Sequence, residues 1–177
     1  MATGFTTIGH SRRGLDEFLG MLRAARVEVL VDVRSFPRSR TNPAYNIDAL
    51  PAELEPVQIG YQHAPELGGR RSKQAGIDEA VNALWRVRSF HNYADYALGE
   101  TFGAAFEALV RLGGERRVAL MCAEAVWWRC HRRIITDYLL LNGQAVEHLM
   151  GRGQTDAAKP TPGAARTAAG KVVYPAA

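Results

Sequence analysis

Hydrophobic and polar positions follow two different periods along this chain, and their alternation predicts an α/β fold. Apolar or β-branched runs of strand length predict five strands, over residues 5–9, 27–33, 57–63, 117–122 and 144–149. Apolar residues at helical spacing predict helices over residues 16–25, 77–87, 93–98, 101–112 and 129–141. The run VEVLVDV at residues 27–33 is almost continuously apolar, as strands covered on both faces are in parallel sheets. We therefore expect about five mostly parallel strands with helices on both faces, in a loosely Rossmann-like or rhodanese-like arrangement.

The 177 residues fit a single domain followed by a tail. Residues 1–150 carry the periodic segments of this α/β domain, whereas residues 151–177 are rich in Gly, Ala, Pro and Thr. Such a composition offers little apolar area to offset the entropy lost on ordering. We expect the tail to be loosely held, with Val172, Val173 and Tyr174 docking on the domain.

Composition is typical of a soluble globular protein, with 47% hydrophobic and 23% charged residues. No apolar run approaches the roughly 20 residues that cross a bilayer, and the N-terminus lacks the basic-then-apolar pattern of a signal peptide. We therefore expect a cytoplasmic protein with no membrane partner. In that reducing compartment, Cys122 and Cys130 are expected to be free thiols, metal ligands or a transient redox pair rather than a structural disulfide.

The formal net charge of +4 favours anionic partners only weakly. Dedicated nucleic-acid binders concentrate basic residues on one face and interleave them with aromatic residues. The arginines here are spread along the chain, so nucleic acid is a weakly supported partner.

Reactive side chains gather in three loops that follow predicted strands, at residues 10–13, 32–40 and 122–132. Right-handed crossovers bring the carboxyl ends of parallel strands to one edge of a sheet, and ligands of open α/β sheets bind at that edge. We therefore expect the three loops to share a site.

The third loop carries the chemistry of a cysteine enzyme. Cys122 ends a predicted strand, Glu124 follows it, and Cys130 and His131 begin the next predicted helix. The helix dipole and the neighbouring arginines favour a thiolate, so one cysteine could act as a nucleophile, with Glu124 or His131 as acid or base. Alternatively, the cysteines fill the core and Glu124 caps the helix or pairs with an arginine. A third interpretation makes all four residues ligands of a transition metal, although their spacing matches no established zinc motif.

Guanidinium and hydroxyl groups in the second loop indicate an anionic ligand. The candidate binding residues there are Asp32, Arg34, Ser35, Arg38 and Ser39. Arginines hold phosphate or carboxylate by forked hydrogen bonds, and the aspartate could fix one of them. To these we add His10, Ser11 and Arg132 from the other two loops. The alternative is a solvated loop with an internal Asp–Arg pair and a purely structural histidine.

Several short motifs lie in or near these three loops. They are residues 7–11 (TIGHS), residues 30–35 (LVDVRS) with Pro37 and Ser39, Leu67-Gly68-Gly69, Cys122-Ala123-Glu124 and Cys130-His131-Arg132. Together they resemble the bacterial family catalogued as domain of unknown function 488, over residues 7–150. The resemblance implies an α/β domain whose site uses these motifs, and it adds Gly68 and Gly69 to the candidate binding residues. It brings no established activity.

The plan of strand, cysteine, loop, arginine and helix is also similar to rhodanese-like sulfurtransferases and related cysteine phosphatases. Those proteins cradle an anion in a tight glycine-rich turn, whereas Glu124, Trp127 and Trp128 stand in the corresponding loop here. Sulfur transfer and phosphatase chemistry are therefore alternatives. The leading hypothesis is a cysteine-dependent hydrolase or transferase that acts on an anionic small molecule or a nucleotide-like group. The competing class is a non-catalytic module that binds nucleic acid or a phosphorylated ligand.

Overall fold

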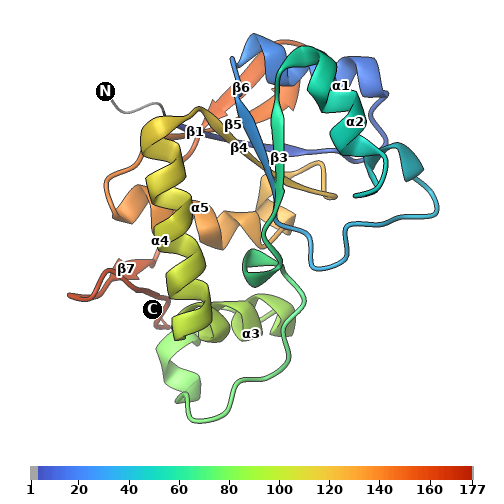
Figure 1. Ribbon diagram of the computed structural model, residues 1–177. Helices are drawn as coiled ribbons and strands as arrows, with labels where there is room; N and C mark the ends of the chain where they lie inside the picture. Colours follow the sequence, from blue (N-terminus) through green and yellow to red (C-terminus); the bar gives the residue numbers. More distant parts are fainter. Residues whose placement is uncertain (1–3, 177) are drawn as a thin grey trace.

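A computed structural model describes residues 4–176 and shows an α/β domain built on a six-stranded sheet (Figure 1). The strand order is β3-β2-β4-β1-β5-β6, in which β1 to β5 are parallel and β6 pairs antiparallel with β5. The strands are β1 (Phe5–Gly9), β2 (Val29–Asp32), β3 (Gly60–His63), β4 (Val118–Cys122), β5 (Val146–Gly151) and β6 (Gln154–Ala157). The mostly parallel sheet predicted from the sequence is therefore present, with an additional antiparallel strand at its edge.

Helices cover both faces of the sheet, and the sheet separates the apolar core into two layers (Figure 1). On one face, α1 (Leu15–Ala24) and α2 (Leu50–Leu54) form an apolar cluster with Leu30 and Met121. On the other, α3 (Arg88–Ala97), α4 (Glu100–Glu115) and α5 (Arg132–Leu141) cluster with Val31 and Leu120. Successive residues of β2 and β4 thus enter opposite layers, which explains why both strands are apolar throughout.

The parallel register aligns the carboxyl ends of three strands. Gly9 lies opposite Cys122, and Asp32 lies opposite Met121. The ladder continues one step further, because the amide of His10 donates to the carbonyl of Cys122 at 3.0 Å. The loops after β1, β2 and β4 therefore leave the sheet side by side.

Three predicted helices have clearly different bounds in the structure, and the one predicted over residues 93–98 begins earlier, as α3 at Arg88. Residues 77–87 hold only the 3-10 turn Glu79–Asn82, whose beginning is capped by the Asp78 carboxylate, which accepts from the Ala80 amide at 2.9 Å. The helix predicted over residues 129–141 begins at Arg132 instead, after the 3-10 turn Trp127–Arg129. Cys130, between them, is extended with φ −127° and ψ 149°. Three further 3-10 turns are Pro43–Tyr45, Glu55–Val57 and Pro65–Leu67.

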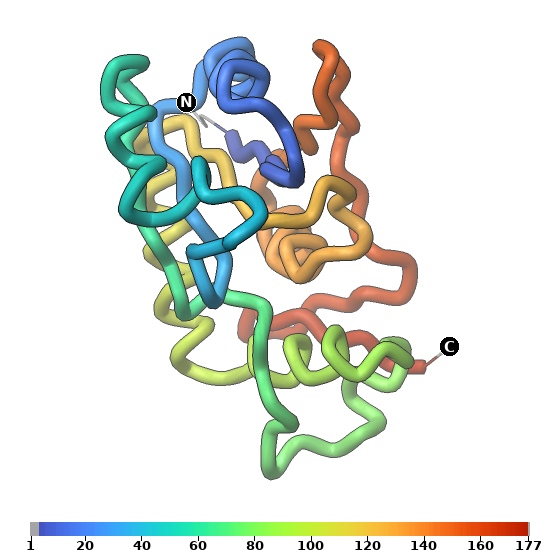
Figure 2. The backbone as a smooth tube through the Cα atoms, turned by 90° about the vertical axis from the view of Figure 1, so that its right-hand side faces the viewer, coloured from blue at the N-terminus to red at the C-terminus, as the bar shows by residue number. Residues whose placement is uncertain are grey.

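The C-terminal segment packs on the domain, which differs from the loosely held tail that its composition predicts. It supplies β6 and the two-stranded pair β7 (Ala165–Arg166) and β8 (Val172–Val173), and it runs beside α3 (Figure 2). Val172 and Tyr174 are buried in the core layer of α3, α4 and α5, as the predicted docking of residues 172–174 requires. The Tyr174 hydroxyl donates to Asp137 Oδ2 at 2.7 Å.

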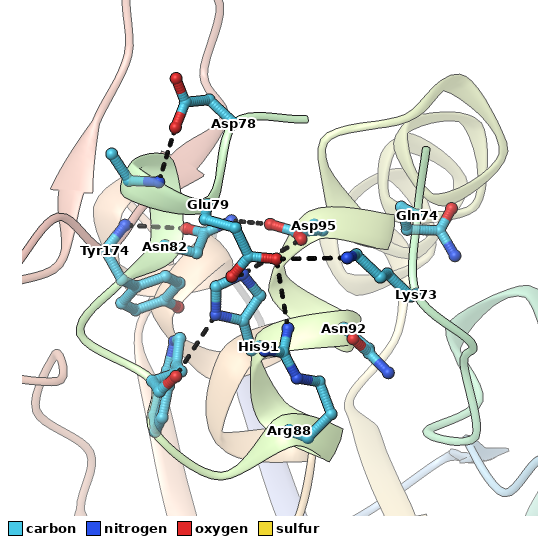
Figure 3. Close-up of polar contacts among 12 residues, drawn as sticks. Lys73, Gln74, Asp78, Glu79, Asn82, Arg88, His91, Asn92, Asp95 and Tyr174 are labelled. Atoms are coloured by element: carbon cyan, nitrogen blue, oxygen red, sulfur yellow. Dashed lines mark hydrogen bonds and ion pairs between the residues drawn. The ribbon is translucent and has the colours of Figure 1, made fainter. Parts of the chain in front are cut away.

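A polar cluster joins the tail to α3 (Figure 3). The Asn82 side chain accepts a hydrogen bond from the Tyr174 amide at 2.9 Å and donates one to Asp95 Oδ1 at 2.7 Å. His91 Nε2 lies 3.3 Å from Asp95 Oδ2 and 3.6 Å from Glu79 Oε2. This cluster fixes the beginning of α3, which faces the carboxyl edge of the sheet.

Among residues 4–176, no helix combines the length and apolar character needed to span a membrane.

Candidate functional site

The three loops line one cavity of about 550 Å³ at the carboxyl edge of the sheet. This volume is typical of small-molecule sites. The predicted site residues that line it are His10, Arg34, Ser35, Arg38, Ser39, Gly69, Cys122, Glu124, Cys130 and His131. The convergence expected from right-handed parallel topology therefore occurs in the structure.

Two free thiols lie in contact in the cavity wall. Cys122 is the last residue of β4, and Cys130 is the extended residue two positions before α5. The intervening loop folds back, so that the two sulfur atoms lie 2.7 Å apart. Both residues are almost fully buried, yet both border the cavity.

His131 holds a defined orientation beside Cys130. Its Nε2 donates to the carbonyl oxygen of Val33 at 2.7 Å. That bond leaves Nδ1 as the acceptor, and Nδ1 lies 3.4 Å from the Cys130 sulfur. Burial lowers the pKa of His131, so the ring is neutral and presents a basic nitrogen to the thiol. Thiol, imidazole and orienting carbonyl are thus arranged like the pairs in which an adjacent base can activate a thiol.

The two thiols differ in acidity. Burial and the hydrogen bond with Cys130 raise the pKa of Cys122 well above its ordinary value. Burial also opposes ionisation of Cys130, but the hydrogen bond from Cys122, the Arg132 guanidinium and the Arg132 amide outweigh it and lower the pKa of Cys130. Cys130 is therefore the more acidic thiol of the pair, and Cys122 keeps its proton to higher pH.

Arg132 supports the site from behind and does not line the cavity. The side chain is 1% exposed, and its Nη2 donates to the carbonyl oxygens of Glu124 and Ala125 at 3.0 and 3.2 Å. Its backbone amide lies 3.5 Å from the Cys130 sulfur. Arg132 thus anchors the cysteine loop and supplies positive charge beside the sulfurs, a position different from the ligand contact expected of it.

A buried network underlies the second loop. Arg34 donates through Nε and Nη2 to the two oxygens of Asp32, at 2.9 and 2.7 Å. Its Nη1 lies 3.3 Å from His10 Nε2, and His10 Nδ1 donates to the Ser11 carbonyl at 2.9 Å. Burial lowers the pKa of His10, so this histidine is a neutral acceptor for Arg34. The internal Asp–Arg pair foreseen as an alternative therefore exists, and it holds the guanidinium at the cavity wall.

Glycines allow close approaches that no other residue would tolerate. A Cβ atom at Gly69 would lie 2.5 Å from His131 Nδ1, and one at Gly9 would lie 1.8 Å from the Glu124 carbonyl oxygen. At Gly68 it would lie 2.5 Å from Ser35 Oγ. These glycines press the loops together and position the imidazole, a packing role that needs no contact with ligand.

Eight residues outside the predicted set also line the cavity: Phe36, Thr41, Asn42, Arg70, Ser89, Phe90, Ala123 and Arg129. Arg70 lies over the exposed ring of Phe36, with its guanidinium carbon 5.1 Å from the ring centre. The Arg129 side chain is exposed and makes no hydrogen bond or ion pair with any residue in 4–176, whereas Arg38 pairs with Asp48 at 2.9 Å. Arg70 and Arg129 adjoin the motif residues Gly69 and Cys130, a sequence signal that could have identified them.

Four predicted site residues do not border the cavity: Ser11, Asp32, Gly68 and Arg132. Each contacts a residue that does, so their places are those of supporting residues. Within residues 4–176, no group of three or more histidine, cysteine, aspartate and glutamate side chains is arranged to hold a metal ion.

Comparison with protein families gives a match over residues 14–139 to the family described as "Domain of unknown function DUF488". Neither the curated proteins nor the solved structures include a match.

Proposed function

The chain belongs to the DUF488 family, whose description carries no activity, and we propose its function from the site: a cysteine-dependent hydrolase or transferase acting on an anionic small molecule or nucleotide-like compound. One observation carries the proposal. The Cys130 sulfur sits between His131 Nδ1, the Cys122 thiol and the Arg132 amide, at the wall of an arginine-lined cavity.

In the first step, the Cys130 sulfur attacks the electrophilic centre of the substrate, and the bond to the leaving group breaks. A covalent adduct on sulfur results. His131 Nδ1 accepts the Cys130 thiol proton as the sulfur attacks, and it then returns this proton to the leaving group. The Val33 carbonyl keeps the ring in the tautomer that this exchange requires.

In the second step, water or another acceptor attacks the adduct and releases Cys130. Glu124 borders the same cavity and is exposed there, so its carboxylate can take a proton from the incoming acceptor. The negative charge of Glu124 also disfavours close approach of a phosphate to this wall, which directs the anionic group of the substrate toward the arginines.

The arginines that line the cavity differ in whether a carboxylate already pairs with them, and substrate recognition depends on this difference. The charge of Arg34 is matched by Asp32, and that of Arg38 by Asp48. Among residues 4–176, Arg129 has no such partner, and the Arg70 guanidinium lies over the Phe36 ring while the Arg70 backbone amide donates to Ser35 Oγ at 2.9 Å. We assign the anionic group of the substrate to Arg129 and Arg70, because a guanidinium without a carboxylate partner keeps its full charge and its forked donors for a ligand. Phe36 and Phe90, also at the cavity, offer ring faces to a planar substrate group.

The proposal is tested with a panel of phosphomonoesters, carboxylate-bearing esters and thioesters, together with thiosulfate for sulfur transfer. Turnover by the native protein should vanish in Cys130→Ser, and kcat should fall about 10²–10⁴-fold in His131→Gln. Quenching during turnover should show the substrate fragment on Cys130 by mass spectrometry. Full activity of Cys130→Ser, or a native protein that turns over no compound of the panel, would contradict the proposal.

A matched pair of variants separates anion recognition from general charge. Arg129→Gln should raise KM for the substrate identified in the panel, while Arg111→Gln removes an arginine of α4 that is also exposed but lies outside the cavity lining. Arg111→Gln should leave KM unchanged. Equal effects of the two variants would remove Arg129 from the binding site.

A further inference from the structure

We infer that Cys122 and Cys130 form a reversible redox site, in which a hydroperoxide oxidises Cys130 and Cys122 then closes an intramolecular disulfide. Oxidation of this pair needs no substrate of the reaction proposed above. Because it consumes the same Cys130 sulfur, it would also inactivate the proposed enzyme.

The geometry of the pair carries this inference. Two thiols 2.7 Å apart are within about 0.7 Å of a covalent S–S bond. Both border a cavity that a small peroxide can enter. The sulfurs come from different elements, the end of β4 and the residue two positions before α5, and the loop between them contains only seven residues. Because the loop is already folded back, closing the bond needs a small movement of side chains.

The two sulfurs have different environments, which assigns their order of reaction. Cys130 faces a basic imidazole nitrogen, the Arg132 amide and a buried guanidinium. These groups favour its thiolate, the form that attacks peroxides. Cys122 remains a thiol, and its single proton can reach either the Cys130 sulfur at 2.7 Å or the Glu124 carbonyl oxygen at 3.6 Å. Cys130 is therefore the peroxide-reactive residue, and Cys122 is the resolving residue.

Atoms and electrons balance in two steps. The Cys130 thiolate attacks one peroxide oxygen, the O–O bond breaks, and the departing oxygen leaves as water or alcohol after taking a proton. Cys130 is now a sulfenic acid, oxidised by two electrons, and the peroxide is reduced. The Cys122 sulfur then attacks the Cys130 sulfur, the S–O bond breaks, and water leaves with the proton of Cys122. A dithiol reductant restores both thiols by exchange.

Tryptic mapping of hydrogen peroxide-treated native protein tests the site directly. Trypsin cleaves after Arg117, Arg129 and Arg132, so Cys122 and Cys130 fall in separate peptides. We expect these peptides to be joined by a disulfide, with a mass about 2 Da below the sum of the free thiol peptides. Dithiothreitol should separate them and restore two titratable thiols. Two free thiols after treatment, or Cys130 sulfinic acid without the joined peptides, would overturn the inference.

Single variants test the order of events. In Cys122→Ser the disulfide cannot close, so dimedone should trap a sulfenic acid on Cys130. In Cys130→Ser, Cys122 should react with peroxide far more slowly and give little dimedone adduct. Equal labelling of the two variants would reject the assigned roles. Cys122→Ala and Cys130→Ala replace either serine variant that does not fold, as judged by circular dichroism. Because labelling needs no substrate, its result is separate from that of the proposed enzymatic function.

Discussion

For single residues, the chemistry of the site depends on how the side chains and amides around Cys130 shift the pKa of its thiol. The Val33 carbonyl, just after the end of β2, and the close approach of Gly69 together fix the His131 imidazole against the Cys130 sulfur. Arg132, which the sequence suggests as a ligand contact, acts instead through its amide and its buried charge. The distinction between a buried and an exposed arginine cannot be read from sequence spacing, because it depends on whether a loop folds over the side chain.

The close approach of Gly69 to His131 gives a prediction at this scale. Gly69→Ala places a methyl group 2.5 Å from Nδ1 in the present geometry, so the ring or the loop must move. We expect a loss of about 1–3 kcal/mol in the free energy of unfolding and slower alkylation of Cys130. Chemical denaturation and mass-spectrometric alkylation rates measure the two effects.

Gly20→Ala is the matched control, because a Cβ atom there meets no neighbouring atom within 4 Å. Within an exposed turn of α1 it should preserve or slightly increase stability. If Gly69→Ala behaved as Gly20→Ala does, the packing of His131 against Gly69 would be refuted.

At the scale of elements, periodicity located the strands well. The predicted strand over residues 5–9 coincides with β1, and the one over residues 117–122 exceeds β4 by a single residue. The convergence of loops also followed from topology alone. Ser89 and Phe90 of α3 could not be foreseen at the cavity, because their position depends on the docking of α3 through Asn82 and Asp95, which are distant from the site motifs in sequence.

The tail illustrates the other limit of local reasoning. Its Gly, Ala, Pro and Thr content predicts weak ordering, yet two residues of the segment, Val172 and Tyr174, are 0% exposed. Burial of a few large side chains against a distant helix can outweigh an unfavourable average composition.

Tyr174→Ala tests the contribution of the tail to stability. It removes a fully buried ring and the hydrogen bond to Asp137, so we expect the free energy of unfolding to fall by about 3–5 kcal/mol. Val173→Ala, at a neighbouring partly exposed position, should cost much less. Equal and small losses in urea denaturation would mean that the tail is not part of the cooperative unit.

At the scale of the whole molecule, buried neutral histidines make stability depend on pH. His148 accepts or donates a hydrogen bond with Thr7 at 2.6 Å and stacks on Trp127 with ring centres 4.6 Å apart. Burial, and then the charge of Arg132, lowers the pKa of His148 from 6.5 to about 4. The unfolded chain therefore binds an additional proton between these pH values, and stability declines as pH falls through this window.

We expect the contribution of His148 to be complete above about pH 6.5 and to disappear by about pH 4, a change of about 3 kcal/mol. Urea denaturation of native protein and of His148→Gln across this range measures it. The variant, which cannot titrate at this position, should show a shallower decline. Parallel curves for the two proteins would assign the acid sensitivity to other groups.

The proposed function requires Cys130 to react as a thiolate at an arginine-lined cavity, and the pH dependence of Cys130 alkylation measures whether it does. Native protein is treated with iodoacetate and, separately, with neutral iodoacetamide, and the tryptic peptide beginning at Cys130 is quantified. We expect a midpoint below the ordinary thiol pKa of 9.0, a preference for anionic iodoacetate relative to a free cysteine, and slow modification of Cys122. A Cys130 that reacts only above pH 9.0 without preferring the anion, or that stays unmodified while Cys122 reacts, would contradict it.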